Sequence, residues 1–164
     1  MYHLSYQVQT NQIGEIYNYL KLSDSVATGG QPTEAQFSLI READYQMVVN
    51  LARPDSPRAV PDEQAIVESL GMQYASIPVD WENPTLEDVA RFFSIMEAIA
   101  EQPVFVHCAA NMRVSAFMYL YRLIHEGMSE EQAKSDLEKI WTPYDTWQAF
   151  IQQTVEYYQH LSLQ

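Results

Sequence analysis

Short apolar runs alternate along the chain with longer segments in which apolar residues recur every three or four positions. The runs at residues 22–30, 47–51, 72–79 and 104–106 predict strands, and the last is continuous enough to be covered on both faces. The periodic segments predict helices over 32–43, 61–71, 85–100 and 113–127, from 129 to the break at 142–143, and over 145–160. Because strands alternate with helices, we expect one three-layer α/β domain with a central, mostly parallel sheet of four to five strands flanked by helices.

Local signals mark several helix ends. Thr33 with Gln36 forms a capping box beside a proline, Ser129 with Gln132 repeats the pattern, and Gly71 closes the helix before it. Residues 11–20 predict a short helix or an ordered lead-in, so we expect a lead-in over 1–21 and the α/β domain over 22–164. Tyr144 and Trp147, near the start of the last helix, are expected in the core.

Composition narrows the cellular setting. The 164 residues are 47% hydrophobic and contain one cysteine. The first residues have neither a basic region nor an apolar core, so no signal peptide is expected. No apolar run approaches the ~20 residues of a membrane span. A lone cysteine forms no internal disulfide, which favours a reducing compartment, so we expect a cytoplasmic protein.

Charge excludes two classes of partner. Nine basic residues against 22 acidic ones give a net charge of −13. A nucleic-acid binder needs a basic face, and an anionic membrane surface would be repelled as well. The same repulsion acts on polyanions at long range, but less on a single phosphate in a buried cradle. The histidines, at positions 3, 107, 125 and 160, are too scattered to imply a metal site, and no cofactor is expected.

The candidate chemistry lies in residues 103–115, which predict a buried strand, a loop and the start of a helix. Cys108 follows His107 at the strand end and precedes Arg113 at the helix start. A loop in this position directs backbone N–H groups and the positive end of the helix dipole at its occupant. Such a site favours an anion, and favours a thiolate over a thiol. Cysteine, anion cradle and arginine together indicate nucleophilic attack on an oxyanion-bearing group.

This stretch resembles the signature of cysteine-dependent protein phosphatases of the protein-tyrosine and dual-specificity type. His107, Cys108, Arg113 and Ser115 are the matching positions. The resemblance implies that Cys108 attacks phosphorus, that Arg113 and the loop amides hold the phosphate oxygens, and that Ser115 hydrogen-bonds the thiolate. The substrate would be a phosphorylated small molecule or a phosphoprotein. The anion-binding loop comprises His107, Ala109, Ala110, Asn111, Met112 and Ser115, and Asn111 best tolerates the left-handed conformation that such a loop requires.

The spacing departs from the family pattern, because four residues rather than five separate Cys108 from Arg113. Two interpretations stay open. The loop is one residue shorter than the family's, or it keeps its length, with Val114 where arginine belongs and Arg113 displaced by one. Either interpretation puts ordinary phosphatase activity in question.

Further stretches, at residues 28–33, 48–53 and 77–80, resemble bacterial phosphatase-like domains of unknown function, so the resemblance covers about residues 22–160. It implies Asp80 as the general acid, with Glu82 as the alternative on the same loop. Arg53 is a candidate for recruiting phosphate at the rim. All follow predicted strands, and the carboxyl ends of parallel strands are where ligands bind in such sheets.

Two other functions remain open. The six-residue segment from Cys108 to Arg113 resembles the loop of rhodanese-type sulfurtransferases, in which the cysteine carries a persulfide. Such domains return to a further strand after the cysteine helix, whereas helical periodicity dominates here. A pseudo-enzyme that binds an anion or a phosphorylated partner without turnover is the third hypothesis.

Overall fold

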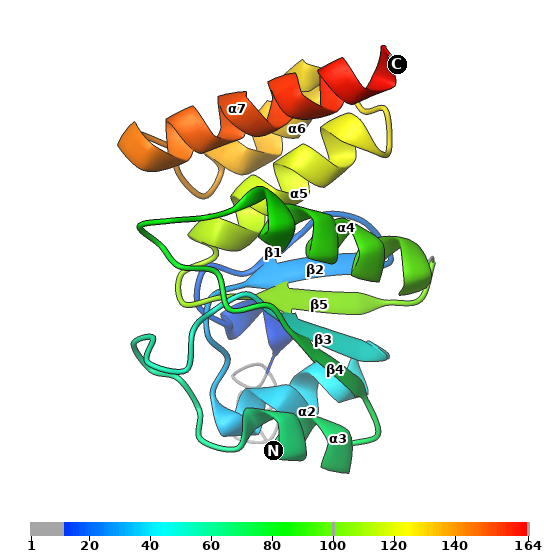
Figure 1. The fold of residues 1–164 in the computed structure, drawn as a ribbon. Helices are drawn as coiled ribbons and strands as arrows, with labels where there is room; N and C mark the ends of the chain where they lie inside the picture. Colours follow the sequence, from blue (N-terminus) through cyan, green and yellow to red (C-terminus); the bar gives the residue numbers. More distant parts are fainter. Residues whose placement is uncertain (1–11, 100, 164) are drawn as a thin grey trace.

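A five-stranded sheet forms the centre of the molecule (Figure 1). The computed structural model describes residues 12–99 and 101–163. The strands, in chain order, are β1 (Leu20–Lys21), β2 (Val26–Gly29), β3 (Met47–Asn50), β4 (Gln73–Ser76) and β5 (Val104–His107). They lie in the order β1-β2-β5-β3-β4, and every neighbouring pair is parallel except β1 and β2. The predicted α/β class and mostly parallel sheet are therefore confirmed.

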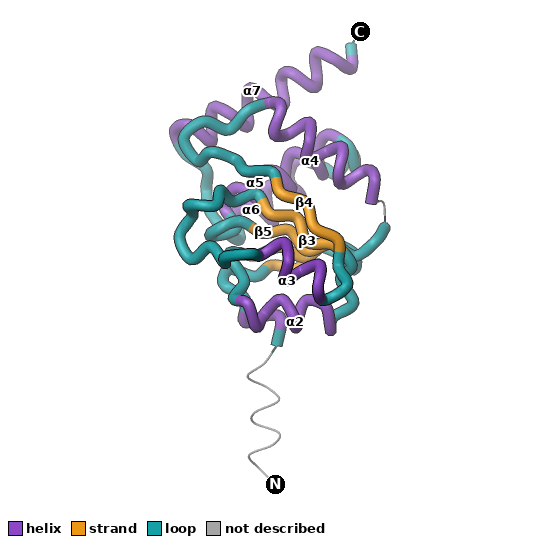
Figure 2. Tube along the Cα trace, turned by 60° about the horizontal axis from the view of Figure 1, so that its bottom comes forward, coloured by secondary structure: helices purple, strands orange, loops and turns teal. Residues whose placement is uncertain are grey.

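Helices cover both faces of this sheet. After a short 3₁₀ helix (η1, Ile13–Glu15), they are α2 (Glu34–Glu42), α3 (Glu63–Ser69), α4 (Leu86–Ile99), α5 (Met112–Ile124), α6 (Glu130–Glu138) and α7 (Asp145–Ser162). Helices α2 and α3 lie below the sheet in Figure 1, and α4 and α5 lie above it. Helices α6 and α7 pack on the outer side of α5, and Figure 2 shows the same division from another side.

Strand β5 is central because its side chains are apolar on both sides. Val104 and Val106 belong to the larger core, which includes residues of α4, α5 and α7. Phe105 points the other way, into the smaller core that contains Phe37 and Ile40 of α2. All four β5 residues are buried, so each face removes apolar surface from water. The sequence prediction of a strand covered on both faces is confirmed.

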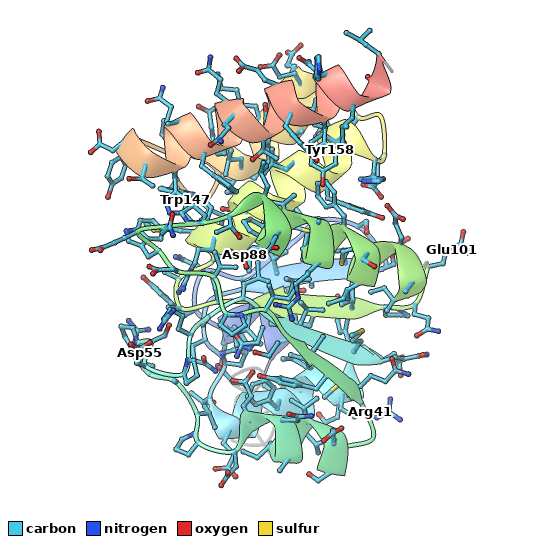
Figure 3. The ribbon with its side chains drawn as sticks, viewed as in Figure 1. Arg41, Asp55, Asp88, Glu101, Trp147 and Tyr158 are labelled. Carbon is cyan, nitrogen blue, oxygen red and sulfur yellow. The ribbon has the colours of Figure 1, made fainter. Side chains whose placement is uncertain are left out.

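The parallel register brings the carboxyl ends of the strands together. His107 at the end of β5 is level with Gly29 of β2 and with Asn50 of β3. The loops that follow these strands lie toward the left of Figure 1. In Figure 3, Asp55 and Trp147 are labelled on that side, whereas Arg41 and Glu101 are labelled on the opposite side. Residues that follow different strands therefore meet at one edge.

The predicted helix caps are present. The Thr33 hydroxyl accepts a hydrogen bond from the Gln36 amide, and the Gln36 side chain accepts one from the Thr33 amide. The Ser129 hydroxyl caps α6 by accepting from the amide of Gln132. Gly71 follows α3 with a φ of 86°, a left-handed conformation that glycine adopts without strain.

Some predicted boundaries were wrong. Residues 22–25 form a turn rather than a strand, because the Ser23 hydroxyl accepts hydrogen bonds from the amides of Ser25 and Val26. The turn joins β2 to the short β1, which falls at the end of the predicted lead-in. Strand β4 is shorter than residues 72–79. Trp147 is buried as expected, but the Tyr144 side chain, which precedes α7, is 59% exposed.

The described residues after β5 form three helices and their connecting loops and no further strand, which departs from the further strand that a rhodanese-like domain would have. No helix in the described part of the chain has the length and apolar character needed to cross a bilayer. The expectation about a signal peptide concerns residues that lie outside the described range.

One glycine is required where β2 meets the cysteine loop. A Cβ atom on Gly30 would lie 2.7 Å from the Ala109 carbonyl oxygen and 2.7 Å from the Tyr17 ring. We expect Gly30→Ala to lower the free energy of unfolding by about 1–3 kcal/mol, because backbone must move to admit the methyl group. Gly14→Ala is the matched control, since a Cβ there meets nothing within 4 Å. Urea denaturation of both variants checks this, and equal stabilities would contradict it.

Candidate active site

Cys108 lies immediately after β5 and before the loop that leads into α5. Its side chain is buried from bulk solvent but lines a cavity of about 410 Å³. Ala109, Ala110, Met112 and Arg113 line the same cavity, so it lies over the N-terminus of α5. The first amides of a helix have no partner within the helix. The cavity is therefore open to a ligand that accepts hydrogen bonds.

The loop carbonyl groups are hydrogen-bonded by the surrounding chain. The Ala109 carbonyl accepts from the Gln31 amide at 3.0 Å, and the Ala110 carbonyl accepts from the Asn18 side-chain amide at 3.0 Å. Gly30 and Ala110 form an isolated antiparallel bridge, and the amides of Ala109, Ala110, Met112 and Arg113 make no hydrogen bond with other described residues. Carbonyls satisfied on one side and free amides on the other form an anion-binding nest.

Asn111 fixes the shape of this loop. It is fully buried and has a φ of 65°, as predicted for the residue most tolerant of the left-handed region. Its side-chain amide donates to the Asn18 carbonyl at 2.8 Å and to the Thr28 hydroxyl at 3.0 Å. The Asn111 side chain thus anchors the loop to β2 and to the residues before β1. It is not among the residues that line the cavity.

Arg113, rather than Val114, faces the cavity. The Arg113 side chain donates from Nη1 to the Val79 carbonyl at 2.9 Å, and its residue is only 6% exposed. Val114 is fully buried in the larger core. Of the two residues that the spacing leaves open for the position of the arginine, Arg113 lines the cavity and Val114 does not, and Arg113 is the second residue of α5.

His107 points away from the cavity. Its Nε2 lies 2.7 Å from a carboxylate oxygen of Glu63, and its Nδ1 lies 3.2 Å from the carbonyl oxygen of Cys108. The ring is fully buried. The predicted anion-binding residue therefore supports the loop from behind and does not line the cavity.

Ser115 is also directed elsewhere. Its hydroxyl donates to the Met112 carbonyl at 3.0 Å and lies 3.0 Å from the indole nitrogen of Trp141, which donates to it. Ser115 is not among the cavity-lining residues. The Ser115 hydroxyl proton therefore goes to the Met112 carbonyl in this structure, and Trp141 donates to the hydroxyl oxygen.

Asp80, by contrast, reaches the cavity. It follows β4, is exposed, and lines the cavity together with Glu82 and Cys108. One carboxylate oxygen of Asp80 accepts the Glu82 amide at 2.9 Å, which fixes the turn. The other oxygen makes no hydrogen bond with the described residues. The carboxylate of Glu82 makes no hydrogen bond with the described residues, so both acidic side chains have an oxygen available on the cavity.

Three tryptophans hold the Asp80 loop. The Trp81 ring lies 5.4 Å from the ring of Trp141 and 5.5 Å from that of Trp147, centre to centre. The indole nitrogen of Trp147 donates to the Trp81 carbonyl at 2.8 Å. Trp141 and Trp147 come from the segment after α6 and from α7. The C-terminal helices therefore position the loop that carries Asp80.

Arg53 lines the rim of the cavity with Asp55, whose carboxylate lies 3.5 Å from the Arg53 guanidinium. Both side chains are exposed, so this pair contributes little to stability. Among the described residues, no group of three or more His, Cys, Asp or Glu side chains is placed to bind a metal ion.

Sequence reasoning missed the residues that support the loop from behind. The prediction of a helix over 61–71 assigns no role to Glu63, although it is four positions before the buried Val67 and so shares its inward face. That spacing was an available signal. Nothing local marks Asn18 or Gln31, because each contacts the loop across about eighty or more positions.

Comparison with known proteins agrees with this geometry. A family model described as "DSP-PTPase phosphatase fused to NAD+ Kinase" matches residues 6–154. No curated protein matches the chain. A solved structure of a DUF442 protein from Shewanella putrefaciens CN-32 is 37% identical and covers 91% of this chain and 97% of its own, with a TM-score of 0.80.

Two other solved structures are similar in fold. TpbA of P. aeruginosa, in complex with pTyr, is 15% identical over 84% of this chain and 90% of its own, with a TM-score of 0.61. PTPMT1, in complex with PI(5)P, is 15% identical over 88% of this chain and 99% of its own, with a TM-score of 0.72. From the family match over most of its length, the chain belongs to the DSP-PTPase phosphatase family described as fused to NAD+ kinase.

Proposed function

We propose that the protein hydrolyses a phosphomonoester through a phosphocysteine intermediate on Cys108. The observation that supports this most directly is that one cavity is lined by Cys108, Arg113 and Asp80 together with unpaired loop amides. These are a nucleophile, a cation, a proton donor and an oxyanion cradle. Family membership supports the phosphatase class, and the geometry supports the assignment of the individual roles.

In the first step, the Cys108 thiolate attacks phosphorus, so an S–P bond forms as the bond to the leaving oxygen breaks. The loop amides and the Arg113 guanidinium stabilise the charge on the three remaining phosphoryl oxygens. Arg113 is already oriented by its hydrogen bond to Val79. Its other donors are unused by the described residues and remain for the substrate.

Asp80 carries the proton in both steps. As the leaving oxygen departs it takes the Asp80 proton, and the resulting carboxylate then accepts a proton from the water that attacks the phosphocysteine. The second step returns the Cys108 thiolate and releases inorganic phosphate. Atoms balance with water as the only other reactant, and neither step needs a metal ion or cofactor.

The substrate class is a phosphorylated small molecule or a phosphoprotein. The fold relatives with bound pTyr and PI(5)P support a phosphorylated partner. Arg53 would recruit the phosphate at the rim, although Asp55 already neutralises much of its charge. The cavity of about 410 Å³ lies within the range of roughly 300–1,000 Å³ typical of small-molecule sites.

The nucleophile is tested with an aryl phosphate. We expect the purified protein to hydrolyse p-nitrophenyl phosphate and Cys108→Ser to reduce turnover to the uncatalysed level, because serine at this position has no activating base. Circular dichroism and stabilisation by inorganic phosphate should be nearly unchanged in the variant. Full activity in Cys108→Ser would contradict the mechanism. Phosphate binding without turnover in the unsubstituted protein would favour the anion-binding pseudo-enzyme instead.

The general acid is tested by varying the leaving group. We expect Asp80→Asn to lower kcat/KM on the order of 10²-fold for phenyl phosphate, whose poor leaving group needs protonation, and much less for p-nitrophenyl phosphate. Glu82→Gln is the matched control, since it changes the same charge on the same loop. Equal losses for both substrates in Asp80→Asn would remove Asp80 as the acid, and a selective loss in Glu82→Gln would transfer the role to Glu82.

A further inference from the structure

A buried chain of polar side chains lies behind the cysteine loop, on the side away from the cavity. His107 is at its centre, between the carbonyl of Cys108 and the carboxylate of Glu63. His107 is fully buried and Glu63 is 7% exposed. The catalytic steps above use neither side chain. Two such groups in contact, one residue from the nucleophile, require a physical explanation.

Glu63 receives hydrogen bonds from three side chains. Gln31 donates at 2.9 Å to one carboxylate oxygen, and the other oxygen accepts from the Tyr74 hydroxyl at 3.0 Å and from His107 at 2.7 Å. Tyr74 is itself held at 3.0 Å by the side-chain amide of Asn50. Every neighbour thus offers Glu63 a donor, which is the arrangement that an ionised carboxylate needs.

The titration of Glu63 follows from these contacts. Burial alone would raise the pKa of Glu63, but the hydrogen bond and charge of His107, with the hydrogen bonds from Gln31 and Tyr74, lower it below its ordinary value. Burial and the nearby Glu63 charge raise the pKa of Tyr74, so its hydroxyl remains a donor. Glu63 is therefore ionised at neutral pH.

The acceptors around His107 determine its protonation. A carbonyl oxygen and an ionised carboxylate only accept hydrogen bonds, so both ring nitrogens must donate. A ring that donates from both nitrogens is an imidazolium. The described neighbours of His107 on three other elements carry no charge: the Phe37 ring of α2 packs against the His107 ring, and Gly29 and Asn50 lie beside His107 on β2 and β3.

We propose that Glu63 is a positioning residue of this active site, which keeps His107 as an imidazolium and so favours the Cys108 thiolate. The charge acts through the buried ring, adjacent in the chain to the nucleophile, where low polarity strengthens it. The same ring fixes the Cys108 carbonyl and with it the direction of the loop amides. The inference rests on the proposed role of Cys108, but it concerns the charge state of the site rather than turnover.

The test uses the single cysteine of the chain, because alkylation then reports Cys108 alone. Iodoacetamide is neutral, so its rate follows the thiolate fraction rather than attraction to the anion cradle. We expect the midpoint of the alkylation rate to shift by about one pH unit to higher pH in Glu63→Gln. Below the midpoint, alkylation of Cys108 would then be about tenfold slower than in the unsubstituted protein. Glu68→Gln is the matched control, since it removes the same charge from an exposed position on α3.

A spectroscopic measurement does not depend on the folding of a variant. With ¹⁵N-labelled histidine in the unsubstituted protein, both ring nitrogens of His107 should carry protons at neutral pH. A neutral His107 ring would overturn the proposal. So would an unchanged alkylation profile in a folded Glu63→Gln protein, or an equal shift in the Glu68→Gln control.

The two proposals fail separately. If Glu63→Gln shifts the pH profile of alkylation but the unsubstituted protein has no phosphatase activity, the result supports the charge pair and contradicts the proposed function. The opposite result is also possible: the protein is an active phosphatase, but Glu63→Gln changes neither the pH profile of alkylation nor the acid limb of kcat/KM. That result would support the proposed function and contradict the role of Glu63.

Discussion

The cysteine loop depends on where its carbonyl groups find their hydrogen bonds. Buried backbone groups must be paired, and here the carbonyls of Cys108, Ala109 and Ala110 accept from His107, Gln31 and Asn18 respectively. Since these donors all come from outside the cavity, the amides of Ala109 and Ala110, in the first two of these peptide units, make no hydrogen bond with other described residues. His107 ends β5 itself, Gln31 follows the neighbouring strand β2, and Asn18 precedes β1 at the edge of the sheet.

The two sides of the cysteine loop differ in what they contact: one side lines the cavity, and the other packs against buried polar side chains. On the cavity side, Arg113 and the N-terminus of α5 supply positive charge beside the carboxylates of Asp80 and Glu82, in a chain whose net charge is −13. On the other side, Glu63 and His107 form a buried pair, with the ring nitrogen 2.7 Å from the carboxylate oxygen. The C-terminal helices add a third constraint, because Trp141 and Trp147 fix the segment that carries Asp80. A site this small thus draws on nearly every layer of the fold.

The sequence was sufficient where signals are local or periodic. The continuous apolar run Val104, Phe105 and Val106 predicts a strand covered on both faces, and the Thr33–Gln36 pair predicts the start of α2. It was insufficient where one side chain meets another far along the chain. Glu63 contacts a histidine 44 positions away, and Ser115 meets Trp141 after 26. Neither pairing has a periodicity, so only the folded arrangement reveals it.

The central claim is that Cys108 becomes phosphorylated during turnover. The most direct measurement is rapid acid quenching of the protein during its first turnover of an aryl phosphate with a good leaving group, followed by intact mass and peptide analysis. We expect the quenched protein to be heavier by one phosphoryl group, carried on the peptide that contains Cys108. Turnover with an unmodified Cys108 at every quench time, or a phosphoryl group on another residue, would contradict it.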